Sequence, residues 1–212
     1  MTILAIPNGR FLENCYLVSD DAEGISILVD PGEDSDTIAA RLAATGTRLQ
    51  AIWLTHAHID HVLGVPALKR ATGAPVYLHP AAGPLYEHVV AQAQTFGMRA
   101  DPLPPPDHPL AHGDVLRIGE LSFGVRHVPG HSAGSVALVG AGVVFAGDVL
   151  FRESIGRTDL FGGDFETLMA SIERELLSLP DETIVYSGHG PPTTIGHERR
   201  HNPFLTRAAR PR

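Results

Sequence analysis

The sequence LTHAHIDHVLG, residues 54–64, places three histidines and an aspartate within six positions, directly behind a short apolar run that predicts a buried strand. Residues two apart point to the same side of an extended chain, so His56 and His58 should leave the end of this strand together. Asp60 and His61 then fall in the first turn of the next helix and face the same cavity. Because imidazole and carboxylate are the usual ligands of zinc, iron and manganese, the cluster predicts a metal site rather than a set of hydrogen-bonded loop histidines.

Three further side chains of ligand type follow predicted strands elsewhere in the chain. His131 lies behind a Pro-Gly turn, Asp148 follows a glycine, and His189 lies between two glycines. Functional groups of α/β folds collect at strand ends, where glycine lets the backbone come close or adopt a positive φ. Together with the four residues of 56–61, these side chains make seven candidate ligands. Seven are too many for one zinc ion and suit two metal ions that share a carboxylate.

The order of the predicted elements indicates a layered α/β fold. Apolar runs bounded by turn residues predict strands, and apolar residues at helical spacing predict helices. The expected strands are 14–19, 25–30, one that begins at 48, 75–78, 115–118, 121–128, 134–139, 142–146 and 183–186. The expected helices are 35–46, 61–72, about 81–95, about 164–178 and about 196–209. The segment 101–113 holds five prolines and is expected to be an irregular connector. Two halves of similar content favour two sheets inside and helices outside.

Composition restricts the class of protein. A chain of 212 residues can bury a sizeable core, and we expect one domain over residues 1–212. The formal net charge of −8 argues against nucleic-acid binding, which needs a basic surface. No segment approaches the roughly 20 apolar residues that span a bilayer, and the N-terminus lacks a basic signal region, so we expect a cytoplasmic protein with no membrane contact. The single cysteine, Cys15, excludes an intrachain disulfide and a cysteine-built zinc site, and it is expected to pack in the core.

The seven candidate ligands, in this order, resemble the signature of the metallo-β-lactamase superfamily: His-x-His-x-Asp-His followed by a distant His, Asp and His. The resemblance implies a four-layer αββα sandwich, in agreement with the element order. It also implies two divalent metal ions (zinc, iron or manganese), one held by His56, His58 and His131, the other by Asp60, His61 and His189, with Asp148 as the bridge. Asp60 and Asp148 are accordingly also the candidate catalytic residues.

Such a centre has a defined chemistry. Two divalent ions about 3.5–4 Å apart lower the pKa of a shared water from about 15.7 to near 7, so that a nucleophile exists at neutral pH. The protein then needs no nucleophilic side chain. The implied activity is hydrolysis.

Two stretches narrow the substrate. GDVLFRESIGRTDLFGGD (147–164) and YSGHGPPTTIGHERRHNPFL (186–205) resemble the short bacterial branch of the glyoxalase II thioester hydrolases. This resemblance implies cleavage of S-D-lactoylglutathione, with Arg157 contacting a substrate carboxylate; the alternative for Arg157 is a surface or salt-bridge role. Longer glyoxalase II enzymes add a C-terminal helical domain that contacts glutathione, and we expect no such separate domain here. The thiol could therefore be held by the remaining loops or by a partner subunit, or it could be another small thiol.

Other activities remain open at this point. Persulfide dioxygenases share the fold and a Gly-Arg-Thr-Asp stretch like 156–159, and in them one Fe(II) is held by residues that match His56, His131 and Asp148. A lactonase is a third possibility, because the same hydroxide attacks cyclic esters. The surroundings of His189 favour the hydrolase.

The oligomeric state stays open. The seven other histidines are assigned to structure or solvent, and five C-terminal arginines are expected on a solvated helix face: Arg199, Arg200, Arg207, Arg210 and Arg212.

Overall fold

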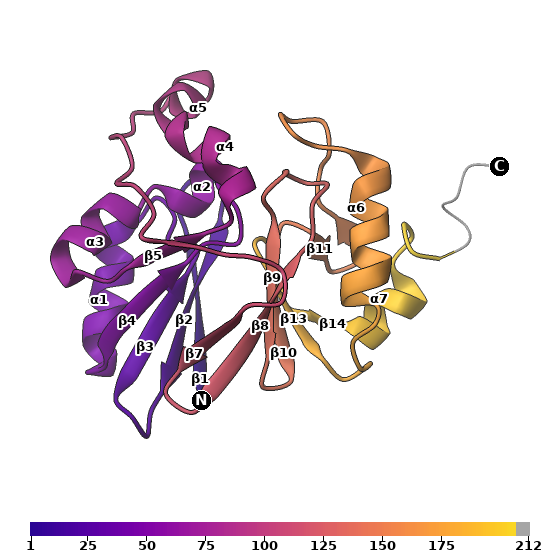
Figure 1. Cartoon of the computed structure of the whole chain (residues 1–212), viewed down its shortest axis with the longest axis horizontal. Coiled ribbons are helices and arrows are strands. Elements are labelled where there is room, and N and C mark those ends of the chain that lie inside the picture. The colour runs from indigo at the N-terminus through magenta and orange to yellow at the C-terminus, as the bar shows by residue number, and fades with distance from the viewer. Residues whose placement is uncertain (207–212) are drawn as a thin grey trace.

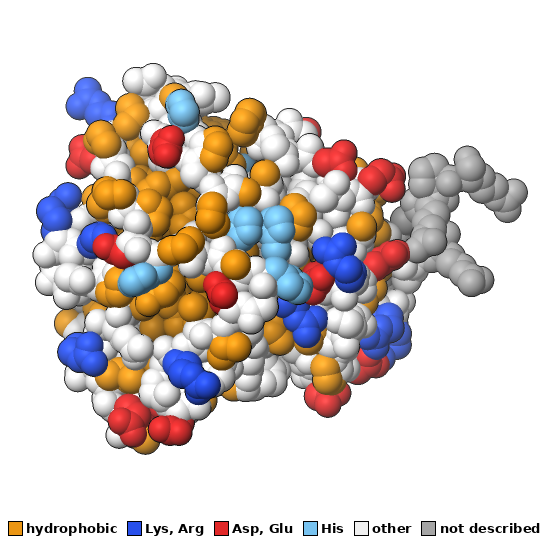
Figure 2. Space-filling model, viewed as in Figure 1, with side chains coloured by type: hydrophobic (Ala, Val, Ile, Leu, Met, Phe, Trp, Pro, Cys, Tyr) orange, Lys and Arg blue, Asp and Glu red, His pale blue; other side chains and the backbone are white. Residues whose placement is uncertain are grey.

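The computed structural model describes residues 1–206, which form two six-stranded sheets packed face to face with helices on the outer faces (Figure 1). The chain thus has the αββα sandwich architecture expected from the sequence. Within the described residues, no helix combines the length and apolar character needed to cross a bilayer. On the face shown in Figure 2, hydrophobic side chains gather on the half that carries the N-terminal elements, whereas Lys and Arg side chains are scattered.

The first sheet has the order β1-β2-β3-β4-β5-β6. Its strands are β1 (Thr2–Asn8), β2 (Glu13–Asp20), β3 (Ile25–Val29), β4 (Arg48–Trp53), β5 (Val76–Leu78) and β6 (His108–Pro109). The first three strands run antiparallel, and β3 to β6 run parallel. Parallel strands need crossovers, and each of the three crossovers in this sheet contains helices.

The second sheet has the order β14-β13-β10-β9-β8-β7. Its strands are β7 (Val115–Ile118), β8 (Leu121–His127), β9 (Val136–Gly140), β10 (Val143–Gly147), β13 (Ile184–Ser187) and β14 (Thr193–Thr194). A separate two-stranded hairpin follows β10 and consists of β11 (Leu150–Phe151) and β12 (Ser154–Ile155). In this sheet β10 and β13 are parallel, so their carboxyl ends meet at one edge.

Helices cover both outer faces of the sandwich. They are α1 (Ser35–Thr45), α2 (Ile59–Val62), α3 (Val65–Thr72), the 3₁₀ turn η1 (Pro80–Ala82), α4 (Gly83–Glu87), α5 (Val89–Thr95), α6 (Phe165–Ser171), the π-helical turn η2 (Ile172–Leu176) and α7 (Ile195–His201). Successive side chains at the end of β4 point to opposite faces of the first sheet. Trp53 faces the second sheet, whereas Ile52 and Leu54 face the helices. Between the sheets, the Trp53 ring packs edge-on against Phe123 at a centroid distance of 5.8 Å.

Nine strands lie within two residues of their predicted ends, whereas five short or edge strands were not predicted: β1, β6, β11, β12 and β14. Pro7 lies in β1, which is at the edge of the sheet, where proline is tolerated. The connector 101–113 is irregular except for β6, which is likewise an edge strand. Cys15 is fully buried in the core, as expected.

Three predicted helices were wrong in detail. The helix expected over 61–72 is divided into α2 and α3, because Gly64 donates its N–H to the Pro31 carbonyl and packs against that backbone. The helix expected near 81–95 is interrupted at His88, whose backbone leaves the helical region. The last predicted helix ends at His201 rather than 209, and its residues 207–209 lie outside the described part.

Two of the five C-terminal arginines are described by the structure. Arg199 and Arg200 both pair with Asp181, and Arg199 also donates to the carbonyl of Leu177. These contacts fasten α7 to the chain between η2 and β13. The other three, Arg207, Arg210 and Arg212, lie outside the described residues.

Candidate metal centre

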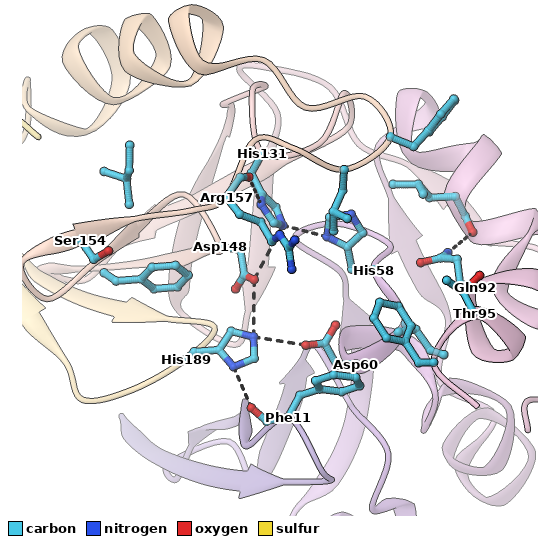
Figure 3. Close-up of a pocket in the computed structure, with 17 residues that line it drawn as sticks. Phe11, His58, Asp60, Gln92, Thr95, His131, Asp148, Ser154, Arg157 and His189 are labelled. Atoms are coloured by element: carbon cyan, nitrogen blue, oxygen red, sulfur yellow. Dashed lines mark hydrogen bonds and ion pairs between the residues drawn. The ribbon is translucent and has the colours of Figure 1, made fainter. Parts of the chain in front are cut away.

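All seven candidate ligands come together at one end of the sandwich, because the strands that precede them end there. Five of them line a cavity, and the fully buried His56 and His61 lie behind these five. His56, His58, Asp60 and His61 follow β4, whereas the other three follow strands of the second sheet: His131 after β8, Asp148 after β10 and His189 after β13. Figure 3 shows His58, Asp60, His131, Asp148 and His189 converging on the same space. The two sheets therefore contribute to a single centre.

A first group of three ring nitrogens comes from His56, His58 and His131. Nδ1 of His58 lies 2.8 Å from Nε2 of His131, which lies 3.2 Å from Nε2 of His56. All three rings are at least nine-tenths buried. This group could hold one metal ion.

A second group consists of Asp60, His61 and His189. Oδ2 of Asp60 lies 3.2 Å from Nε2 of His189 and 3.9 Å from Nε2 of His61. His61 is fully buried, and the other two are partly exposed toward the cavity. This group could also hold a metal ion.

The carboxylate of Asp148 lies between the two groups. Its Oδ1 is 3.4 Å from Nε2 of His61, and its Oδ2 is 3.4 Å from Nε2 of His189 and 3.7 Å from Nε2 of His131. One carboxylate thus contacts rings of both groups, which is the position expected for a bridging ligand.

Hydrogen bonds behind the rings fix which nitrogen faces the cavity. Four of the five rings have Nδ1 within hydrogen-bonding distance of an oxygen, so that each can donate Nδ1–H and turn the lone pair of Nε2 toward the centre. These bonds are His56 to Thr55 Oγ1 (3.0 Å), His61 to Asp30 Oδ2 (3.1 Å), His131 to the Arg157 carbonyl (2.9 Å) and His189 to the Phe11 carbonyl (3.2 Å). His58 is reversed, because its Nδ1 faces the centre.

The centre fits a cation. Among residues 1–206, four buried side-chain atoms lack a hydrogen-bond partner: Oε1 of Glu13, Nε2 of His58, Nε2 of His61 and Oδ1 of Asp148. The last two lie 3.4 Å apart within the cluster. A buried polar atom without a partner costs about 1–3 kcal/mol, and more when it is charged. Nitrogen and carboxylate donors at this spacing are the ligand set that zinc, iron and manganese prefer, so the residues suit a metal of that kind.

The second group and Asp148 carry both signs of charge in the metal-free chain. Burial would raise the pKa of Asp148, but His61 and His189 outweigh it and hold that pKa well below its usual range. Burial likewise opposes protonation of His189, yet hydrogen bonds to Asp148 and Asp60 raise its pKa to about 10. Ionised carboxylates here therefore attract protons onto the rings, as they would attract a metal cation. Metal binding must release these protons.

The first group differs from the second in the charge of its rings. Burial lowers the pKa of His58 to about 3, with His131 adding to the effect, and burial lowers the pKa of His56 well below its usual range. Both rings are consequently neutral at pH 7 and offer a free lone pair. Neutral imidazole is the form that binds metal.

The sequence analysis missed Asp30, which supports this cluster from behind. Asp30 accepts the backbone N–H of Thr55 (2.7 Å) and its hydroxyl (2.5 Å), and it also accepts Nδ1–H of His61. Through Thr55 it orients His56 as well. A signal was available, because Asp30 directly follows the apolar strand β3 just as Asp148 follows β10.

Glu13 and Asn14 were also missed, and neither carried a sequence signal. Glu13 is fully buried behind His61, with its Oε1 3.8 Å from Nδ1 of that ring, and burial raises its pKa. The Asn14 amide donates to the carbonyls of Ser187 (3.1 Å) and Gly190 (2.8 Å), on either side of His189. Strand β2 thereby holds the loop that carries His189.

Arg157 lies at the wall of the cavity, and its guanidinium is engaged in an ion pair. Its Nε and one terminal nitrogen donate to the two oxygens of Asp159 at 2.7 and 2.8 Å. Both side chains are well exposed. A role that the sequence did not suggest belongs to the Arg157 backbone, whose carbonyl orients His131.

Other aromatic rings and the remaining histidines differ in whether they border the site. Phe161 lines the cavity, whereas Tyr77 and Tyr86 do not, and the Tyr86 hydroxyl donates to the Pro104 carbonyl. The seven other histidines lie outside the cluster. One of them, His127, stacks on His79 at a centroid distance of 4.2 Å.

The fold and the geometry agree with comparisons to known proteins. The family model described as the metallo-beta-lactamase superfamily matches residues 8–189, and the chain belongs to this superfamily of metallo-hydrolases. The chain is 38% identical over 209 residues to a hydroxyacylglutathione hydrolase, GloC, of Haemophilus influenzae. The alignment covers 97% of this chain and 98% of that protein.

Two solved structures are similar over nearly the whole chain. The B3 metallo-beta-lactamase BLEG-1 superposes with a TM-score of 0.89 at 42% identity, covering 97% of this chain and 100% of that chain. TTHA1623 in a di-iron-bound form superposes with a TM-score of 0.88 at 46% identity, covering 95% and 100%.

A substitution at Gly188 tests whether close backbone approach shapes the centre. A methyl group there would lie 2.1 Å from Oδ1 of Asp148 and 2.7 Å from Cε1 of His61, so Gly188→Ala must displace ligand side chains. We expect elemental analysis to show a loss of at least one metal ion per chain. The matched control is Gly190→Ala, two residues away. It has φ +73° and open space around its Cα, so it should cost about 1–2 kcal/mol of backbone strain and keep its metal. Equal metal contents in the two variants would contradict this account.

A second test concerns Asp30. Asp30 accepts hydrogen bonds from Thr55 and His61, and the Asp30→Asn variant replaces one accepting oxygen by an NH2 donor. At least one of these hydrogen bonds should therefore be lost, and Thr55 and His61 should be held less firmly. Loss of such supporting hydrogen bonds typically weakens metal binding about 10–100-fold. Competition with a chelator measures this affinity, with the exposed Asp36→Asn as control. An unchanged affinity in Asp30→Asn would show that Asp30 does not position the ligands.

Proposed function

We propose that this protein is a hydrolase that cleaves the thioester bond of a small molecule such as S-D-lactoylglutathione, with two divalent cations in the centre. The observation that carries the proposal is the pair of three-residue groups at one end of the sandwich, with Asp148 in contact with rings of both. His56, His58 and His131 would hold one cation, and Asp60, His61 and His189 the other. When bound, such cations supply an activated water at neutral pH and polarise a carbonyl group.

The side chains of the cavity have defined tasks in this proposal. Asp148 holds both halves of the centre at a fixed separation, because it contacts rings of both groups. Asp60 borders the cavity, and although burial opposes its ionisation, His61 and His189 keep its pKa below the usual value. Its carboxylate is therefore ionised, which is the form that binds a cation. A thiolate, with a pKa of about 8.5, leaves without help from a general acid.

Three observations support a thioester as the substrate. The relative from Haemophilus influenzae is a hydroxyacylglutathione hydrolase and matches the chain end to end. The cavity of about 580 Å³ has the size typical of small-molecule sites. Arg157 lies at its wall, where an anionic group of the thiol could compete with Asp159.

One competing activity has an observation in its favour. His56, His131 and Asp148 are a two-histidine, one-carboxylate set of the kind that holds a single Fe(II), and they lie together in the structure. The surroundings of His189, residues 187–191, resemble the hydrolase branch and favour the hydrolase.

The purified protein distinguishes these activities directly. We expect thioester hydrolysis of S-D-lactoylglutathione, followed as loss of the thioester, and no oxygen uptake with glutathione persulfide. A β-lactam serves as a third substrate, given the similarity to BLEG-1. Asp148→Ala should abolish the hydrolysis. Oxygen consumption without hydrolysis, in a protein that holds one iron, would overturn the proposal.

Arg157→Ala tests the substrate contact. If the guanidinium binds a carboxylate of the thiol, this variant should raise KM for a glutathione thioester about tenfold and leave KM for a neutral thioester nearly unchanged. Asp159→Ala is the matched control, because it removes the competing partner and should not raise KM. If both variants have the same effect on both substrates, the pair is a surface salt bridge.

A further inference from the structure

Apolar side chains dominate the cavity that leads to the metal centre. Four phenyl rings reach it from four separate segments: Phe11 between β1 and β2, Phe96 after α5, Phe151 in β11 and Phe161 in the loop before α6. Phe96 is 43% exposed and Phe161 72% exposed. Large apolar groups left exposed around a concave site indicate a surface that an apolar ligand covers.

The cavity extends to both sides of the metal centre. Figure 3 shows Gln92 and Thr95 on one side of the labelled histidines and carboxylates, and Ser154 on the other, with Phe11 beside Asp60. On the α5 side, the rings of Phe11 and Phe96 meet edge-on at a centroid distance of 5.4 Å. Leu85 and Ile59 complete this wall. We name these four residues (Phe11, Ile59, Leu85 and Phe96) the α5 slot.

Polar groups beside the α5 slot are already satisfied. The side-chain amide of Gln92 donates to the carbonyls of Ala57 (3.2 Å) and Leu85 (2.6 Å). Thr95 donates its hydroxyl to the Ala91 carbonyl at 3.1 Å. A group bound in the slot therefore meets carbon surface and few free donors.

The positive charge of Arg157 indicates how the thiol and acyl parts of a thioester would be oriented in the cavity. Among residues 1–206, Arg157 is the one Lys or Arg side chain that lines the cavity. It belongs to the segment that follows β12, and Ser154 of β12 lies across the centre from Gln92 and Thr95 (Figure 3). A thiol that carries carboxylates, such as glutathione, is attracted to that side. The acyl group, on the other side of the reacting carbonyl, then points to the α5 slot.

We propose that the preferred substrate has an apolar acyl group of about the size of a phenyl ring, which the α5 slot binds. This inference rests on the thioester hydrolysis proposed above. The lactoyl group ends in a single methyl and would leave the rings of Phe11 and Phe96 uncovered, whereas an aromatic or branched acyl group would cover them. In the slot, binding of such an acyl group would be stabilised by burial of its additional carbon surface rather than by polar contacts.

A matched pair of thioesters tests the size of the acyl group. S-D-mandeloylglutathione differs from S-D-lactoylglutathione by a phenyl ring in place of the methyl group, with the same thiol and the same hydroxyl. We expect kcat/KM to be at least about tenfold higher for the mandeloyl thioester. Phe96→Ala should reduce this ratio toward one. The control is Phe165→Ala, which removes a half-exposed ring outside the cavity and should keep the ratio. A ratio of one or below in the active wild-type protein would overturn the proposal.

Binding of the free acids gives a readout that does not need turnover. Calorimetry with the metal-loaded protein should give a Kd for D-mandelate about tenfold below that for D-lactate, and Phe96→Ala should abolish the difference. Equal affinities for the two acids would overturn the slot even if both thioesters are hydrolysed. Tighter mandelate binding with neither thioester hydrolysed would support the slot and refute the proposed hydrolysis, so the two failures are distinguishable.

Discussion

The carboxylate of Asp148 is the interaction on which the site depends. It comes from the second sheet, is buried, and contacts His61 from the first half of the chain as well as His131 and His189 from its own half. Burial of this anion is costly unless cations or strong donors surround it. In the metal-free chain, protonated His61 and His189 provide that compensation. A metal ion would provide it more directly, and this is the physical reason for a metal centre at the junction of the two sheets.

The scaffold is adapted to bring such groups close together. Glycines precede Asp148 and His189, and at Gly147 a methyl group would lie 2.4 Å from the Thr55 hydroxyl that supports His56. Asp30 then links Thr55 and His61 from behind. Ligands on short loops at strand ends are thus fixed by backbone contacts and by one buried carboxylate. The directions in which the ligand nitrogens point are determined before any ion binds.

Much of this arrangement could be predicted from the sequence, because its signals are local. An apolar strand followed by a ligand-type residue marks Asp148 and His189 without knowledge of tertiary structure. The same signal marks Asp30, which we assigned to the end of a strand. Glu13 carries no such signal, since its burial results from packing of β2 against the loop of His189. The helices that were wrong, such as 61–72, break where tertiary contacts such as that of Gly64 override local periodicity.

The walls of the cavity were the least predictable part. Phe11, Phe96 and Phe151 lie on segments that are distant in sequence, and only the tertiary structure places them around one space. The pairing of Arg157 with Asp159 also depends on loop geometry. Substrate preference is encoded in these loops, whereas the chemistry is encoded at the strand ends. A sequence motif therefore predicts the reaction class better than it predicts the substrate.

The number of metal ions is the central claim. Anomalous X-ray diffraction from crystals of the protein as purified measures it directly. The account predicts two anomalous peaks about 3.5–4 Å apart, one beside His56, His58 and His131 and one beside Asp60, His61 and His189, with Asp148 between them. A single peak at the first group, with no metal at the second, would contradict it.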